Sequence, residues 1–115
     1  YPMVMDTVGC APTWLKANAK AAQALANSYF EALEMIKADP AKSNEIMGAA
    51  VKQPGEKFAE SSKYLRWQDK AANQKFFSGE LMQFMKDSVP ILLEAGVIRK
   101  APDDLNATFD ASFIK

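Results

Sequence analysis

Most of the chain repeats apolar residues at intervals of three and four positions, which is the spacing of one face of an α-helix. The clearest case is residues 19–38, a segment rich in alanine. Asn18 is a suitable N-cap for this helix, and Asp39-Pro40 ends it and begins the next one. The apolar stripe that we expect to face the core consists of Leu25, Tyr29, Ala32, Leu33 and Ile36.

Further helices are expected on both sides of this segment. Thr13 can cap a short helix before it, and prolines open two helices after it, at positions 40 and 54. A longer helix runs from residue 79 to about 95, with a bend predicted at Pro90. Gly96 then ends it in the left-handed conformation. The pattern predicts five to six helices over residues 13–100 and a tail of loop and turn over 101–115.

The first segment of the chain differs from the rest. Residues 1–11 are bounded by Pro2 and by Gly9 and Pro12, and we predict one extended β-strand there. A single strand cannot satisfy its own backbone groups, and no second strand follows in the sequence. We therefore expect this strand to pair either with a second copy of the chain or with a sheet that belongs to a larger protein.

Composition narrows the possible functions. Hydrophobic residues make up 49% of the chain and charged residues 24%, which is ordinary for a globular protein. Fourteen basic residues balance fourteen acidic ones, so no net field attracts nucleic acid or an anionic membrane. No apolar run reaches the roughly 20 residues that a membrane span needs. One partial domain over residues 1–115 is expected, without nucleic acid as a partner.

Catalytic and metal-binding chemistry is not indicated by the residues. The chain contains no histidine and one cysteine, Cys10, so the commonest general base and the usual metal clusters are absent from the sequence. No phosphate-binding loop or nucleophile motif occurs. We expect no enzyme activity, no catalytic residue, no metal and no cofactor.

Three stretches in order resemble the C-terminal part of a known family. They are Tyr1-Pro2 with a segment ending at residues 14–18, then residues 32–40, and then residues 92–103 with their Ala-Gly-Val-Ile turn. Together they are similar to the solute-binding proteins of ABC importers of the nitrate, sulfonate and taurine type, a group that includes thiamine-pyrimidine proteins. The order and spacing agree over nearly the whole chain.

The resemblance implies that the chain is the C-terminal part of the substrate-binding component of an ABC importer. The solute would be small and anionic, or contain organic sulfur or nitrogen: a sulfonate, taurine, nitrate or a pyrimidine. The implied fold is a fragment of a two-lobe α/β binding protein, periplasmic or lipid-anchored, with an ABC permease as partner. The chain departs from the family at residues 18–20, where a proline is usual, and at Pro90. The lack of histidine disfavours the pyrimidine-synthase branch.

The resemblance also suggests where a ligand would lie. Solutes bind between the lobes at the carboxyl ends of strands, which in this chain points to Asp6, Thr7 and Cys10. The alternative is that these are edge-strand residues with ordinary hydrogen bonds, with the cysteine as a small buried hydrophobe. Trp14 and Trp67 are better interpreted as packing residues than as ligand-stacking ones.

A second function remains open at this stage. The chain is then a self-standing helical interaction domain that forms a homodimer through its first strand. A reading frame that extends upstream by about one domain, roughly 150–200 residues, favours the binding protein over this alternative.

Overall fold

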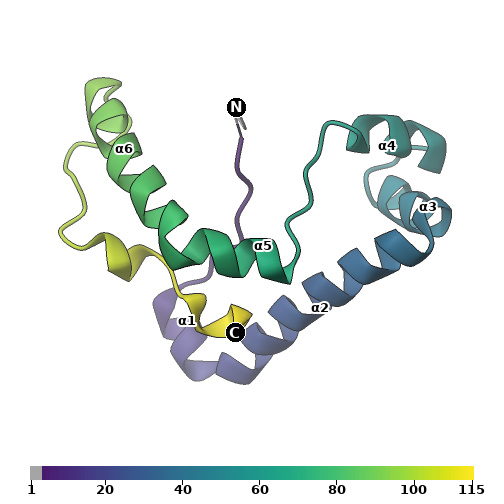
Figure 1. Ribbon diagram of the computed structural model, residues 1–115, viewed down its shortest axis with the longest axis horizontal. Helices are drawn as coiled ribbons and strands as arrows, with labels where there is room; N and C mark the ends of the chain where they lie inside the picture. The colour runs from purple at the N-terminus through teal and green to yellow at the C-terminus, as the bar shows by residue number, and fades with distance from the viewer. Residues whose placement is uncertain (1–3) are drawn as a thin grey trace.

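The computed structural model describes residues 4–115, and within this range every regular element is helical. A long helix, α2, leads to a pair of shorter helices, and α6 is the second long element (Figure 1). The elements are α1 (Pro12–Ala17), α2 (Ala19–Ala38), α3 (Pro40–Ala50), α4 (Gly55–Ser62), α5 (Lys70–Lys75), a π-helical turn η1 (Phe76–Glu80), α6 (Leu81–Glu94), and two 3-10 turns, η2 (Leu105–Thr108) and η3 (Ala111–Ile114).

The predicted N-terminal strand is wrong over the residues that the structure describes. Residues 4–11 have no regular secondary structure, and Val4 and Val8 are 80% and 77% exposed. An extended segment becomes a strand only when a partner supplies the other half of the hydrogen-bonded ladder, and residues 4–115 supply none. The part of the prediction that falls on residues 1–3 lies outside the described residues. The described chain is all-helical, so the expected α/β fragment with one strand is corrected.

Two predicted helix ends are confirmed. Asp39 caps α3, because its Oδ1 accepts a hydrogen bond of 3.0 Å from the backbone N–H of Lys42. Gly96 has φ of 68° after α6, and the N–H groups of Val97 and Ile98 donate to the Leu92 carbonyl at 2.9 and 3.3 Å. Such a turn satisfies carbonyl groups that the helix leaves without partners, as the sequence predicted.

Two other predicted caps are wrong. Helix α1 begins at Pro12 with Ala11 as its N-cap residue, so Thr13 lies inside the helix and does not cap it. The Asn18 side chain does not cap α2; its amide donates to the Trp14 carbonyl at 3.0 Å and so closes α1. The helix that begins at Lys70 is capped by Asp69, whose Oδ1 accepts from the Ala72 N–H at 2.9 Å. Asn and Asp side chains bond to several nearby backbone groups, so sequence spacing alone does not decide which end of a turn they close. Pro90 lies inside α6, which is assigned as one helix.

The helices form an open V and not a compact bundle. α2 and α6 are the two arms, and α5 lies near the bottom between them (Figure 1). The radius of gyration is 16.8 Å, whereas a compact domain of this length has about 13 Å. The accessible surface is 9250 Å², against roughly 6,200 Å² for a typical folded monomer of this size. The extended N-terminal segment explains part of the excess, and the uncovered arms explain the rest.

The corner between α3 and α4 is the best packed region. A Cβ atom added at Gly48 would lie 2.8 Å from the Gln53 carbonyl oxygen, and one added at Gly55 would lie 3.0 Å from Glu45 backbone atoms. Two glycines therefore allow the two helices to approach at backbone distance. Elsewhere in the described chain the buried hydrophobic residues are few: Ala22, Leu33 and Leu81.

Candidate functional site

The residues expected to line a ligand site do not form one in this structure. Asp6, Thr7 and Cys10 lie in the irregular N-terminal segment, and all three are exposed. No hydrogen bond or ion pair joins their side chains to another residue in the described range 4–115. Cys10 is a free, exposed thiol, so the expectation that it is a small buried hydrophobe is also wrong here. Burial at these positions requires atoms from outside the described chain.

The two tryptophans are not buried either. Trp14 and Trp67 are each about two-fifths exposed, at 41% and 42%. They lie in α1 and in the connector before α5, and neither lines the hollows described below. Contacts within the described residues therefore cover these rings only in part, and their interpretation as packing residues is only partly supported.

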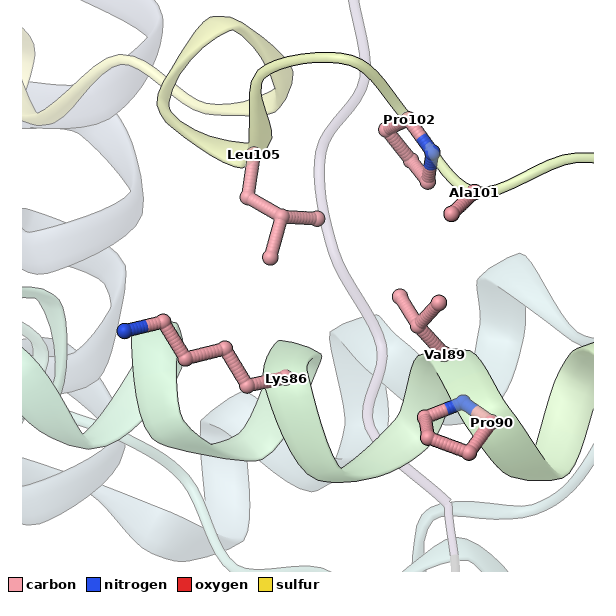
Figure 2. A pocket seen from close by; sticks show the side chains of 6 residues that line it. All are labelled: Lys86, Val89, Pro90, Ala101, Pro102 and Leu105. Carbon is pink, nitrogen blue, oxygen red and sulfur yellow. The ribbon is translucent and has the colours of Figure 1, made fainter.

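The larger hollow lies between α6 and the chain that follows it. It has a volume of about 240 Å³, and Val89 and Pro90 face Ala101, Pro102 and Leu105 across it (Figure 2). Lys86 is the only charged residue of the lining, and its ammonium group extends along the helix away from Pro90 (Figure 2). Recognition of a small anion needs several convergent donors, and this lining offers one at its rim.

A smaller hollow lies in the angle between α2 and α3. Its volume is about 100 Å³, and its walls are apolar apart from one hydroxyl group. That group belongs to Ser43, which is 4% exposed and whose Oγ has no hydrogen-bond partner in the part of the chain that the structure describes. An orphaned buried hydroxyl is costly, so a polar atom from outside residues 4–115 would lower the free energy at this position. The remaining lining residues are Ala32, Met35, Ile36, Ile46 and Met47.

Apolar side chains remain uncovered along both arms. The stripe on α2 was predicted to be core, yet Leu25 is half exposed and only Leu33 is buried. On α6, Phe84 is 48% exposed and Ile91 is 65% exposed. Apolar surface of this kind on a folded chain marks a place where another element docks. The largest functional feature of the chain is therefore a surface and not a pocket.

The charged groups of the described residues form contacts at the surface. The ion pairs of the described residues join exposed side chains, most of them three positions apart on one helix or turn. The Lys37 ammonium group donates a hydrogen bond of 2.8 Å to Glu34, which raises the pKa of Lys37, and Asp69 at 4.0 Å adds a smaller contribution. Hydrogen bonds from Ser112 hold the pKa of Asp110 below its usual value. Both shifts belong to exposed structural contacts.

Neither a metal cluster nor a membrane-spanning helix is found among the described residues. Residues 4–115 contain no group of three or more His, Cys, Asp or Glu side chains placed to hold a metal ion. None of the helices in that range combines the length and the apolar character needed to cross a bilayer.

Sequence reasoning missed the most informative polar residue, Ser43. It lies three positions after Pro40, inside the first turns of α3, and a serine there is usually on the helix surface. The signal that could have indicated it is the neighbouring apolar pair Ile46 and Met47, which lies at helical spacing from it.

Comparisons with known proteins return no relative of this chain. No family model, no curated protein and no solved structure matches it.

Proposed function

We propose that this chain is a helical part of the substrate-binding component of an ABC importer. The observation that carries the proposal is the uncovered apolar surface of both arms, together with a total surface that exceeds the expected monomer value by about 3,000 Å². Surface of that size matches what permanent interfaces bury. It supports a chain whose core is completed by other parts of the same protein.

Many proteins contain a segment whose core is completed by the rest of the protein. The resemblance to the nitrate, sulfonate and taurine group supports the choice of an ABC importer's binding protein among them. Two of its motifs coincide with well-formed helix ends: the Asp39 cap of α3 and the Gly96 turn after α6. The solute would be a small sulfonate, taurine, nitrate or a pyrimidine, and it would bind only with the rest of the protein present. The partner would be an ABC permease, and the location would be periplasmic or anchored outside the cytoplasmic membrane.

The two hollows are what we expect of a chain that supplies packing surface to the binding protein and few contacts to its ligand. Their walls are apolar, and one ammonium group and one hydroxyl are the polar groups they offer. A sulfonate or nitrate needs more donors than that within a closed cleft. The chain would contribute packing surface to the binding protein and few of its ligand contacts.

A second candidate is a helical interaction module that associates through its apolar helix faces. The exposed residues Phe84 and Ile91 favour it, because they lie seven positions apart on α6 and so share one face of the helix. Association through a first strand, which the sequence suggested, is not carried forward, since residues 4–11 form none.

One experiment separates the two. An antibody raised against the 115-residue chain is used to probe the source cells after fractionation, and the polypeptide it detects is purified and titrated with taurine, alkanesulfonates, nitrate and pyrimidines by calorimetry. The proposal expects an extracytoplasmic polypeptide larger than this chain that binds one of these solutes. A polypeptide of only 115 residues, or a larger one that binds none of them, contradicts it.

A further inference from the structure

The last residues of the chain form a bridge between the two arms. The Gln23 side-chain amide in α2 donates to the Phe113 carbonyl at 2.8 Å, and the Gln74 amide in α5 donates to the Ile114 carbonyl at 2.9 Å. Two adjacent carbonyl groups of η3 therefore accept hydrogen bonds from α2 and from α5, two helices that are separated in sequence by α3 and α4. We call residues 105–115 the C-terminal clasp.

The other end of the clasp is fixed to the α6 side. The Phe109 ring packs edge-to-face on Phe77, with 5.7 Å between the ring centroids and 75° between the planes. The Thr108 hydroxyl donates to the Leu105 carbonyl at 2.7 Å, and its oxygen lies 3.3 Å from the Met85 sulfur of α6. Phe109 and Phe113 are half-buried. Aromatic pairs of this geometry attract each other beyond the effect of the area they bury, so this contact attaches the clasp to η1.

The clasp holds its own shape through two acidic caps. Asp104 Oδ1 accepts from the Asn106 N–H at 2.9 Å and so opens η2. Asp110 Oδ1 accepts from the Ser112 N–H at 2.9 Å and so opens η3. Asp104 directly precedes the clasp and Asp110 lies inside it, so both bonds are local to the two turns and lower the entropy that the turns lose on docking.

Other links between the arms are weaker. Lys37 in α2 and Asp69 before α5 are 4.0 Å apart and both exposed, and such a pair contributes little. The Tyr29 hydroxyl reaches the Gln68 carbonyl at 3.3 Å, which is long for an O–H donor. The connector between α4 and α5 has no helical structure and cannot fix an angle by itself.

We propose that the C-terminal clasp sets the angle between the α2 arm and the α6 arm. When the clasp is docked on Gln23 and Gln74, the apolar faces of α2 and α6 are held at one fixed angle. When the clasp is released, α6 can rotate about the connector between α4 and α5. The orientation of the uncovered faces, and hence their fit to one docking surface, depends on eleven residues that themselves add little to that surface.

The test measures the angle directly. In a Cys10→Ser background, spin labels are attached at Lys57→Cys on α4 and Glu94→Cys on α6, both exposed positions, and the distance distribution is recorded by pulsed electron resonance. Labelled chain is diluted with unlabelled chain so that only distances within one molecule are seen. The clasped chain should give one narrow maximum. In Gln23→Ala/Gln74→Ala the maximum should shift and the distribution broaden.

Matched controls remove the same chemical groups without touching the clasp. Gln83→Ala removes an amide that bonds to Asp87 on its own helix, and Gln53→Ala removes an exposed amide from the loop between α3 and α4. Alanine favours helix, so circular dichroism should show unchanged helix content in every variant. Phe109→Ala, which acts on the other end of the clasp, should reproduce the broadening. An unchanged distribution in the double variant and Phe109→Ala, or equal broadening in the controls, overturns the proposal.

Discussion

The α3–α4 corner and helix α6 differ in how closely they are packed within the chain. At the corner, Gly48 and Gly55 let two short helices meet at backbone distance, and Gly48 itself is buried. Helix α6 is longer and more apolar, yet only Leu81 at its start is buried. The comparison shows that an apolar stripe does not by itself make a core; a helix needs a neighbour at the right distance.

The same difference explains which region depends on atoms outside the chain. The corner closes on itself through local contacts, so we expect it to keep its structure in isolation. Helix α6 receives contacts mainly from η1 before it and from the clasp after it, and Phe84 and Ile91 remain uncovered. We expect its stability to rise when the rest of the proposed binding protein covers that face.

The largest expected effect comes from filling the corner. Gly48→Val places a Cβ atom 2.8 Å from the Gln53 carbonyl oxygen, a backbone atom that cannot turn away. Overpacking of this kind should lower the free energy of unfolding by about 2 kcal/mol. Urea titration followed by circular dichroism measures it. Gly9→Val is the control, because a Cβ there meets nothing within 4 Å. Equal midpoints for the two variants would show that the corner is not close-packed.

A smaller effect is expected at the end of α6. Gly96 has φ of 68°, a conformation that costs other L-residues about 1 kcal/mol. Gly96→Ala should therefore destabilise α6 by about that amount, and Gly96→Asn by less, since asparagine tolerates the left-handed region better. Thermal unfolding of the three proteins checks the order. A midpoint for the alanine variant above that of the parent chain would contradict the cap seen here.

A charge on the exposed face of α6 should change the stability little and reduce the exposed apolar surface. Ile91→Glu changes a side chain that is 65% exposed, so stability should move by less than about 0.5 kcal/mol. Binding of a dye that reports apolar surface, and self-association in the ultracentrifuge, should both fall. Gln53→Glu, which adds the same charge at an exposed polar position between α3 and α4, is the control. A large loss of stability in Ile91→Glu would mean that this face is already covered within the chain.

The smallest effect is a pH dependence of the clasp. Hydrogen bonds from Ser112 lower the pKa of Asp110 from its ordinary 3.8, so the carboxylate stabilises the folded chain above that pH. That contribution is lost as the pH falls through the lowered folded-state pKa, because the protonated group loses most of its attraction for the Ser112 N–H. The label distance distribution described above should broaden below about pH 4. Asp110→Asn should shift less with pH, and an equal shift would assign the effect to other carboxylates.

The sequence predicted the helices and several of their ends well, but not their arrangement. The α2 boundaries, the Asp39 cap and the Gly96 turn follow from local chemistry that acts over a few residues. The strand at residues 1–11 failed over its described part, because strand formation depends on a partner that local chemistry cannot supply. The stripe containing Leu25 predicted a buried face and could not say that nothing in the chain covers it.

The candidate site was less predictable than the fold. Asp6, Thr7 and Cys10 were selected by position at a strand end, and without that strand they lie in an exposed irregular segment. The clasp could not be foreseen, since its bonds join Gln23 and Gln74 to backbone carbonyls about 90 and 40 residues away. Backbone acceptors carry no sequence signal, so contacts of this kind emerge only from the three-dimensional structure.

Hydrogen exchange of the isolated 115-residue chain, at a dilution where it is monomeric, tests the central claim most directly. Backbone amides of the α3–α4 corner should exchange slowly, and those of α6 between Phe84 and Ile91 should exchange faster, because the exposed face of that helix has no covering neighbour in residues 4–115. Protection of α6 equal to or greater than that of the corner would contradict the account, because it would mean that the chain completes its own core.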